Sequence, residues 1–382
     1  MRRTYLDHAS TTPPRPEVLA ALTRWTALPA ADPGRLHTEG RIVRDALEEA
    51  RRQVAAFVGA TPREVVFTSG GTEAINAAVW GATRQHPGAP VLYADVEHSA
   101  VREASTRLAP AEIIPVDSAA RIDAGAIGSR LAAHSLPRVA LVHCQWANHE
   151  VGTLQPVHEI VRLCRDAGVP VHVDAAAACG HVALDLADLG ADLVSLSAHK
   201  IGGLPGAGAL IVRRGSRFEP LIVGGEQERA RRGGLEAIPA LVGFGAAAAA
   251  LGADGARLLH FEADRARGYL AALSSSATEV EGVEVVSPPQ PDQRLPSLLC
   301  LGVHGVEAEP VLIGLDRAGV AVHSGSACSS ESIEPSPVLE AMGVDASHSL
   351  RVSVGWSTTE EDVAAFGTAF AEVVAGLRAL RG

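Results

Sequence analysis

Short apolar segments and helix-like segments alternate through the first two thirds of the chain. The apolar segments are rich in Val, Leu and Ile and cover residues 65–67, 91–96, 138–145, 170–176, 193–198 and 208–214. The helix-like segments between them cover residues 74–84, 99–108, 157–167 and 184–189. Apolar strands separated by helices are typical of a parallel sheet that is covered on both faces. The pattern therefore predicts an α/β fold over residues 60–250.

The pattern of the last third is different. A long helix-like stretch at residues 255–277 is followed by short strand-like segments at residues 283–287, 297–303 and 320–325, and then by a final helix-like segment at residues 360–380. This mixture predicts a smaller α+β domain, with the boundary near residues 252–255.

Composition and charge exclude several classes of protein. The formal net charge of −11 argues against a broad nucleic-acid surface, which needs clustered cations. No run reaches the roughly 18 apolar residues that a membrane span requires. The opening MRRTYLDHAS has no apolar core of a secretory signal behind its two arginines, so we expect a cytoplasmic enzyme.

The cysteines fall into two groups. There are five, at positions 144, 164, 179, 300 and 328, with no C-x-x-C pair, so neither a disulfide framework nor a metal site is expected. The first four lie in apolar or helical surroundings, which predicts plain core cysteines. Cys328 lies among Ser and Gly in HSGSACSSESIEPSPVL, which is typical of an accessible nucleophile. The alternative is an incidental loop cysteine.

Lysine is almost absent from the chain. Lys and Arg total 33, yet Lys200 is the single lysine. A lysine amine forms an imine with an aldehyde, whereas a guanidinium stays protonated and does not. Lys200 follows a predicted strand in SAHK and precedes the Gly-rich IGGLPGAG. Since ligands bind at the carboxyl ends of such strands, Lys200 is the leading candidate for covalent chemistry, the alternative being a lysine retained by chance.

Other polar residues also follow predicted strands. Asp174 ends a buried-type strand in VHVDAAAA, where a carboxylate needs a cation or a capping role. His98 follows another strand in EHSAV, where its ring suits stacking on a cofactor, unless it is an ordinary core or surface histidine. Gly71 and Thr72, in FTSGGTEAIN, begin a predicted helix, which suits a phosphate, although a simple helix cap has the same pattern.

Taken together, these segments resemble the class V aminotransferases, and within them the NifS/IscS-type cysteine desulfurases. The resemblance runs nearly end to end, through YLDHASTTP, REVVFTSGGTEAIN, VDAAAACG, SLSAHKIGG, GGEQER, SGSACSSESIEPSPVL and SLRVSVGWSTTEED. It implies the fold of type I pyridoxal-phosphate (PLP) enzymes, with a mostly parallel seven-stranded sheet. It also implies a large PLP-binding domain of residues 12–251 and a small α+β domain of residues 1–11 and 252–382, which carries the Cys328 loop.

The resemblance further implies a reaction and roles for individual residues. L-cysteine would give L-alanine and a persulfide on Cys328, and the sulfur would pass to an acceptor protein. Lys200 would hold PLP as a Schiff base and move the Cα proton, while Asp174 and His98 would contact the ring. His149 would contact the 3-hydroxyl of PLP, and Arg351 and Asp32 would bind the substrate. The residues that would surround the PLP phosphate are Gly71, Thr72, Ser197 and His199. A homodimer is also implied.

The chain departs from the family pattern at four of its positions. His149 stands where Asn is usual, and Ala177 where a Gln normally follows the aspartate by three residues. Leu235 replaces the Thr of an RSGT segment, and the loop that usually begins NPSS begins with Asp32. A histidine can still donate a hydrogen bond at position 149, whereas each family hydrogen bond that is lost is worth about 0.5–1.5 kcal/mol. Two alternatives therefore stay open, namely a related PLP enzyme such as a lyase or aminotransferase, and a scaffold without activity.

Overall fold

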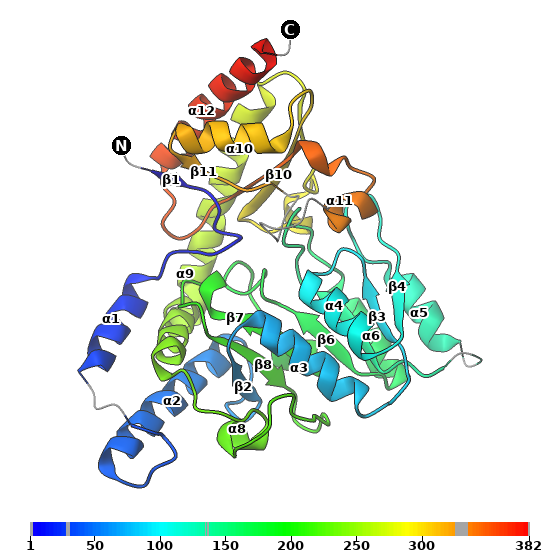
Figure 1. Cartoon of the computed structure of the whole chain (residues 1–382), viewed down its shortest axis with the longest axis vertical. Helices are drawn as coiled ribbons and strands as arrows, with labels where there is room; N and C mark the ends of the chain where they lie inside the picture. Colours follow the sequence, from blue (N-terminus) through cyan, green and yellow to red (C-terminus); the bar gives the residue numbers. More distant parts are fainter. Residues whose placement is uncertain (1–2, 28–30, 134, 136, 325–334, 381–382) are drawn as a thin grey trace.

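A seven-stranded sheet forms the centre of the larger part of the molecule (Figure 1). The computed structural model describes residues 3–27, 31–133, 135, 137–324 and 335–380. The strand order is β2-β8-β7-β6-β5-β3-β4, and β8 alone runs antiparallel to its neighbours. The strands are β2 (Val65–Thr68), β3 (Val91–Ala94), β4 (Ala111–Ile114), β5 (Leu141–Gln145), β6 (Val171–Asp174), β7 (Leu193–Ser197) and β8 (Gly208–Val212). The prediction of an α/β fold with a mostly parallel seven-stranded sheet is confirmed.

Helices cover both faces of this sheet because successive strand residues point to opposite sides. On one face, Val66, Leu141 and Leu210 pack with the alanines of α3 (Gly71–Thr83). On the other face, Phe67, Val142 and Ile211 belong to the main core, which also includes residues of α2, α6 and α9. The helices of this part are α1 (Pro16–Thr26), α2 (Thr38–Phe57), α3, α4 (Ser99–Leu108), α5 (Ala124–Ala132), α6 (Val157–Ala167), α7 (Leu186–Leu189), α8 (Gln227–Ala230) and the first half of α9 (Ile238–Thr278).

The smaller part is built around a three-stranded antiparallel sheet of order β12-β10-β9. A short parallel pair, β1 (Thr4–Tyr5) with β11 (Val320–Ala321), brings the start of the chain to this region. The remaining elements are β9 (Val283–Val285), β10 (Leu298–Val303), α10 (Ala308–Arg317), α11 (Pro337–Ala341), β12 (Ser349–Ser353) and α12 (Glu360–Ala379), together with short 3-10 turns at Ala198–Lys200, Pro291–Gln293 and Ala346–His348.

Helix α9 connects the two parts (Figure 1). Its two halves, Ile238–Asp254 and Ala256–Thr278, meet at an angle of 88°. The first half contributes to the main core and the second half to a separate core with α12 and β10. No single helix in the described part combines the length and apolar character of a membrane span, and the two halves of α9 meet that criterion only when taken together. The domain boundaries at residues 11/12 and 251/252 stay a prediction.

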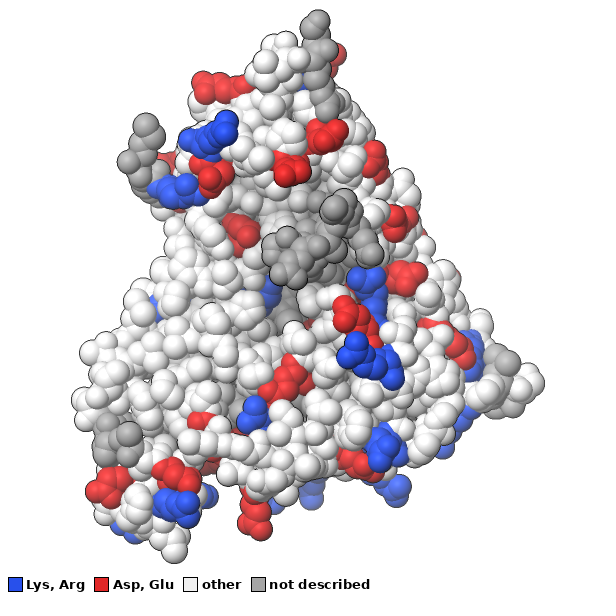
Figure 2. Space-filling model, viewed as in Figure 1, with Lys and Arg blue, Asp and Glu red and all other residues white. Residues whose placement is uncertain are grey.

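On the face shown in Figure 2, acidic and basic side chains lie intermixed over the elements of both parts.

The four cysteines that the sequence predicted for the core, Cys144, Cys164, Cys179 and Cys300, are all buried and unpaired. The prediction of plain core cysteines is confirmed for these positions.

A buried ion pair fixes the segment 226–230 against α2 and the sheet. The guanidinium of Arg51 donates to both carboxylate oxygens of Glu228, at 2.5 and 2.7 Å, and both side chains are at most 2% exposed. Glu228 also accepts from the backbone N–H of Phe67 at 2.8 Å. These contacts hold three successive residues, Glu228, Arg229 and Ala230, at positive φ of 49°, 60° and 61°. Such backbone is costly for residues with a Cβ, so it depends on the ion pair.

The ion pair gives a stability prediction. Arg51→Gln leaves the Glu228 carboxylate buried without its cation, so the free energy of unfolding should fall by about 3–5 kcal/mol in urea titrations. Arg52 is the matched control, since it is 57% exposed and pairs with Glu49 at the surface. Arg52→Gln should change the free energy of unfolding by less than about 1 kcal/mol. Equal effects of the two substitutions would contradict this account.

Candidate active site

Polar residues gather at the carboxyl edge of the parallel strands. Asp174 is the last residue of β6, and Ser197 is the last residue of β7. His98 is the N-cap of α4, which follows β3, and Gly71 is the first residue of α3, which follows β2. This edge is where ligands bind in sheets of this kind. The structure therefore brings four of the predicted site residues to one side of the sheet.

Asp174 is a buried carboxylate that forms no ion pair with the described residues. It is 8% exposed, and its Oδ1 accepts from the Ser195 hydroxyl at 2.7 Å and from the Ala176 N–H at 3.0 Å. Both of these donors are neutral. Because a buried charge is costly unless it is paired, the site favours a cationic ligand group at this carboxylate. A protonated pyridine nitrogen fits that requirement.

Two histidine rings lie above this edge. The ring centroids of His98 and His149 are 5.2 Å apart, and the Nδ1 of His98 accepts from the Ala100 N–H at 3.1 Å. Burial lowers the pKa of His98, with the charge of Lys200 acting in the same direction and Asp174 opposing it. The pKa of His149 is lowered well below its ordinary value, mainly by burial. The nearby His98, Arg351 and Lys200 act in the same direction. Both rings are therefore neutral near pH 7.

The start of α3 lies against the end of β7. A Cβ added at Gly71 would lie 3.5 Å from the Cβ of Ser197 and 3.7 Å from that of Ala176, and nothing lies within 4 Å of a Cβ added at Gly70. Helix N-termini present N–H donors that bind phosphate. The close packing at Gly71 and the open space at Gly70 fit a phosphate at this helix end. Thr72 is exposed beside it.

Lys200 lies in a 3-10 turn directly after β7. Its Nζ donates to the backbone oxygen of Ser10 at 2.9 Å and to that of Ala9. Its charge lowers the pKa of His98, His149 and His199, which places it close to the histidines of the site. The lysine, the two ring histidines and the strand-end aspartate therefore share one region.

His199 and Arg351 contact the N-terminal segment. The Nδ1 of His199 lies 3.2 Å from the Thr11 hydroxyl, and burial with the nearby Lys200 charge lowers the pKa of His199 to about 4. Arg351, on β12, is 5% exposed and donates to the backbone oxygen of His149 at 3.0 Å and to Asp7 at 3.0 Å. Its Nε is buried with no hydrogen-bond partner among the described residues. A buried, partnerless N–H on a guanidinium fits an anionic ligand.

Two predicted residues are not brought into this region by the described contacts. Asp32 forms an ion pair with Arg35 and accepts from the Gly34 N–H at 2.7 Å, beside a cavity of about 530 Å³ that is also lined by Arg51 and Glu228. Its assignment to the substrate stays a prediction. Cys328 lies outside the described residues, so its role also stays a prediction.

The sequence reading assigned no role to two buried acids of the site. Glu97 is 1% exposed and accepts from the Gln145 N–H at 2.7 Å, while its Oε2 has no partner among the described residues. Burial raises the pKa of Glu97 to about 8, and Asp174 adds to the rise. Glu150 accepts from the Ser336 hydroxyl, and burial raises its pKa to about 7. Glu97 lies in the EHSAV segment and Glu150 directly follows His149, but no sequence pattern shows that the two acids are buried.

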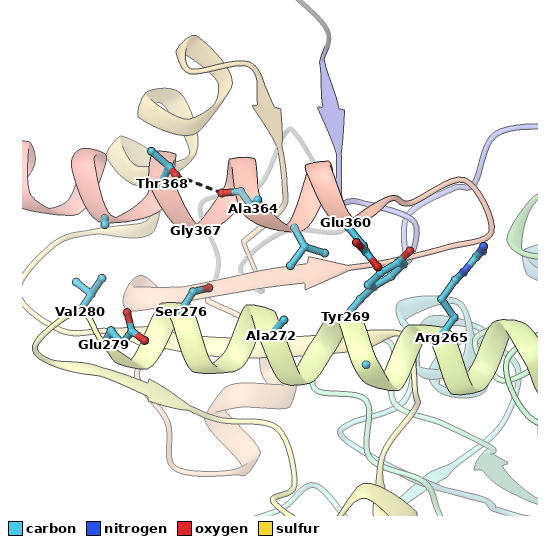
Figure 3. A pocket seen from close by; sticks show the side chains of 13 residues that line it. Arg265, Tyr269, Ala272, Ser276, Glu279, Val280, Glu360, Ala364, Gly367 and Thr368 are labelled. Atoms are coloured by element: carbon cyan, nitrogen blue, oxygen red, sulfur yellow. Dashed lines mark hydrogen bonds between the residues drawn. The ribbon is translucent and has the colours of Figure 1, made fainter.

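A larger groove lies elsewhere. It has a volume of about 1030 Å³ and lies between the second half of α9 and α12. Figure 3 shows Tyr269 of α9 pointing toward Glu360 of α12, with the small side chains of Ala272 and Ala364 further along. None of the residues predicted for the active site lines this groove. The polar residues gathered at the strand edge therefore lie apart from this groove.

The fold and the polar strand edge define a type I PLP-enzyme architecture. The sequence profile of the family described as "Aminotransferase class-V" matches residues 4–366, and the chain belongs to that family. A protein from Cereibacter sphaeroides named "Cysteine desulfurase" is 39% identical, with alignment over 100% of this chain and 98% of the relative.

Solved structures agree with this assignment. A "NIFS-LIKE PROTEIN" superposes with a TM-score of 0.89 and 28% identity, covering 98% of this chain and 100% of that chain. A structure titled "SspA in complex with cysteine" has a TM-score of 0.79 and 27% identity, covering 93% of this chain and 100% of that chain. The resemblance to NifS/IscS-type proteins and the predicted type I fold are thus confirmed.

Glu97 gives a pH-dependence prediction. Its pKa is about 8 in the folded protein against 4.5 as the ordinary value, so between these pH values the folded state holds a proton that the unfolded state loses. The contribution of Glu97 to stability is therefore present at low pH and is lost as pH rises through about 8. Glu97→Gln removes this loss, so its free energy of unfolding relative to wild type should increase from pH 5 to about pH 8 and level off above that pH in urea titrations.

The control for this prediction is Glu281→Gln, at an exposed position outside the site. Its stability relative to wild type should show no such rise across the same pH range. A Glu97→Gln difference that is constant with pH would contradict the assignment of a buried, protonated acid.

Proposed function

We propose that this chain is a cysteine desulfurase that converts L-cysteine to L-alanine and places the sulfur on Cys328 as a persulfide. The main support for this function is that the only lysine of the sequence, Lys200, lies at the carboxyl edge of the sheet, close to His98 and His149. The charge of Asp174 reaches the same histidine, His98, and so belongs to this region. The relative named "Cysteine desulfurase" and the structure titled as an SspA–cysteine complex support this reaction and this substrate.

The cofactor that suits these residues is PLP. Lys200 would hold its aldehyde, Asp174 its ring nitrogen, His98 the face of its ring, and His149 its 3-hydroxyl. The phosphate would lie at the start of α3, with Gly71, Thr72, Ser197 and His199 around it. When bound, PLP supplies an electron sink that stabilises negative charge at the substrate Cα.

Three residues then act on the substrate, and Lys200 has a second task among them. Arg351 binds the substrate carboxylate through its buried guanidinium, as a fork of N–H donors does well. Lys200, once its amine is released, takes and returns the proton at the substrate Cα. Cys328, as a thiolate, takes the substrate sulfur, so that the C–S bond breaks, an S–S bond forms, and the remaining carbon skeleton leaves as alanine.

The proposal includes two protein partners in the cytoplasm. One is a sulfur-acceptor protein that takes the persulfide sulfur, and the other is a second copy of this chain. Val223 and Leu235 are 74% and 62% exposed, and their segments adjoin, because the Gly233 N–H donates to the Ile222 oxygen at 2.8 Å. Large exposed apolar side chains grouped in this way support a homodimer contact.

Replacing Lys200 tests the covalent role of the amine. Lys200→Arg keeps a cation near Ala9 and Ser10 but forms no imine, so the purified protein should lose the yellow colour of covalently held PLP. Sulfide release from cysteine with a reductant should fall by at least about a thousandfold. An absorbance spectrum and a sulfide assay check both results. Persistence of the imine absorbance in the variant would refute the assignment, and a wild type that stays colourless with added PLP would favour a scaffold.

Replacing Cys328 tests the destination of the sulfur. Cys328→Ser should keep the colour and the spectral response to cysteine but release at least about a hundredfold less sulfide, because a hydroxyl is a far weaker nucleophile than a thiolate. The matched control is Cys164→Ala, at a buried position on α6, which should keep sulfide release. Normal sulfide release by Cys328→Ser would point instead to a lyase.

A further inference from the structure

A turn at residues 7–10 holds the side chains proposed for both the Schiff base and the substrate carboxylate. The N–H of Ser10 donates to the Asp7 oxygen at 3.1 Å, which closes the turn. The turn is fixed to the small sheet, because the Ala9 N–H donates to the Ser353 hydroxyl at 2.8 Å. Its backbone oxygens accept from Lys200, and its side chains contact Arg351.

The contacts around Arg351 form a closed triangle. The Nη2 of Arg351 donates to the Asp7 carboxylate at 3.0 Å and to the Ser10 hydroxyl at 2.6 Å, and that hydroxyl donates to the same Asp7 oxygen at 2.9 Å. A guanidinium Nη carries two hydrogens, so both hydrogens of Nη2 have acceptors. The Nη1 donates to the His149 oxygen at 3.0 Å, whereas the buried Nε has no partner among the described residues.

This arrangement affects any carboxylate ligand of Arg351. A carboxylate that binds side-on uses Nε and the adjacent Nη2, and here Nε is available while Asp7 already contacts Nη2. The ligand must therefore share Nη2 with Asp7 or displace it. Two carboxylates on one guanidinium lie a few ångströms apart and repel each other, which weakens the binding of each.

The geometry points to Asp7 as a specificity-determining residue, an internal carboxylate that competes with the substrate carboxylate for Arg351 and thereby sets the affinity of the site. This inference rests on the proposed function, which makes Arg351 the substrate-carboxylate residue. Without a ligand, Asp7 neutralises a guanidinium that is only 5% exposed and would otherwise be a buried, unpaired charge. With a ligand, the same carboxylate opposes binding, so amino acids bind more weakly than Arg351 alone would allow.

The test measures ligand binding separately from sulfur chemistry. Asp7→Asn keeps an Oδ1 acceptor for Arg351 and Ser10 but removes the negative charge. The probes are L-alanine, which has the carboxylate but no sulfur, and ethylamine, which is alanine without the carboxylate. Each is titrated against the PLP-loaded protein by the change in cofactor absorbance. The affinity for alanine should rise about tenfold in Asp7→Asn, whereas the affinity for ethylamine should change less than about twofold.

Two control variants separate charge competition from other effects. Ser10→Ala removes a hydrogen bond to the same guanidinium without changing the charge, so alanine binding should stay the same or weaken. Asp166→Asn removes one negative charge on the surface of α6, where Asp166 is 63% exposed, and should leave both ligands unaffected. With cysteine, Asp7→Asn should lower KM about tenfold with kcat within about twofold of wild type.

The outcomes distinguish this inference from the proposed function. Alanine affinity that is unchanged or weaker in Asp7→Asn overturns the competition, and a weaker value in both Asp7→Asn and Ser10→Ala means that the turn only positions Arg351. Equal gains for alanine and ethylamine also overturn it, because the effect would not depend on the ligand carboxylate. Protein that takes up no PLP overturns the proposed function and this inference together, whereas normal sulfide release with unchanged alanine affinity overturns the inference alone.

Discussion

The buried carboxylate of Asp174 is the constraint from which the rest of the site follows. It ends a strand in the middle of the sheet and is 8% exposed, and its hydrogen-bond donors in the described part of the chain, the Ser195 hydroxyl and the Ala176 N–H, are neutral. Burial of a lone charge is unfavourable, so this position requires a cation from a ligand. Glu97 lies close to this carboxylate, and its burial, with Asp174 acting in the same direction, raises its pKa to about 8. Two buried acids thus lie at the same edge, and Glu97 keeps its proton near pH 7.

The second requirement is that segments from both ends of the chain meet at this edge. Asp7 and Arg351 are separated by 344 residues, yet their side chains are in contact. They meet because β1 pairs with β11 and because the segment after β1 forms a parallel bridge with the end of β12, where the Ser353 N–H donates to the Leu6 oxygen. The N-terminal turn then reaches Lys200 at the end of β7. The small sheet therefore acts as the support that brings an arginine and a turn to the large sheet.

Local sequence patterns predicted some elements well and missed others for physical reasons. The helices at 99–108 and 157–167 have the predicted bounds, because each has a clear apolar face. Strand β4 was not in the apolar pattern, since it lies at the sheet edge and most of its residues are partly or fully exposed. Helix α9 begins at Ile238 rather than at residue 255, and the change of direction at residues 254–256 separates its two halves. A bend of this kind comes from packing against two cores, which no short sequence window contains.

The sequence by itself determined the chemistry that is possible here, because residue types are fixed before folding. The amino-acid sequence alone contains one lysine able to form an imine, an aspartate at the end of a predicted strand and a Gly-rich helix start. The family resemblance is also present in the sequence. Only the tertiary structure decided which charges face each other. That Asp7 neutralises Arg351, that Glu150 bonds to Ser336 and that Asp32 lies beside a separate cavity depend on contacts between distant segments. Such contacts arise from the packing of two cores, and electrostatic energy depends on distance and burial rather than on position in the chain.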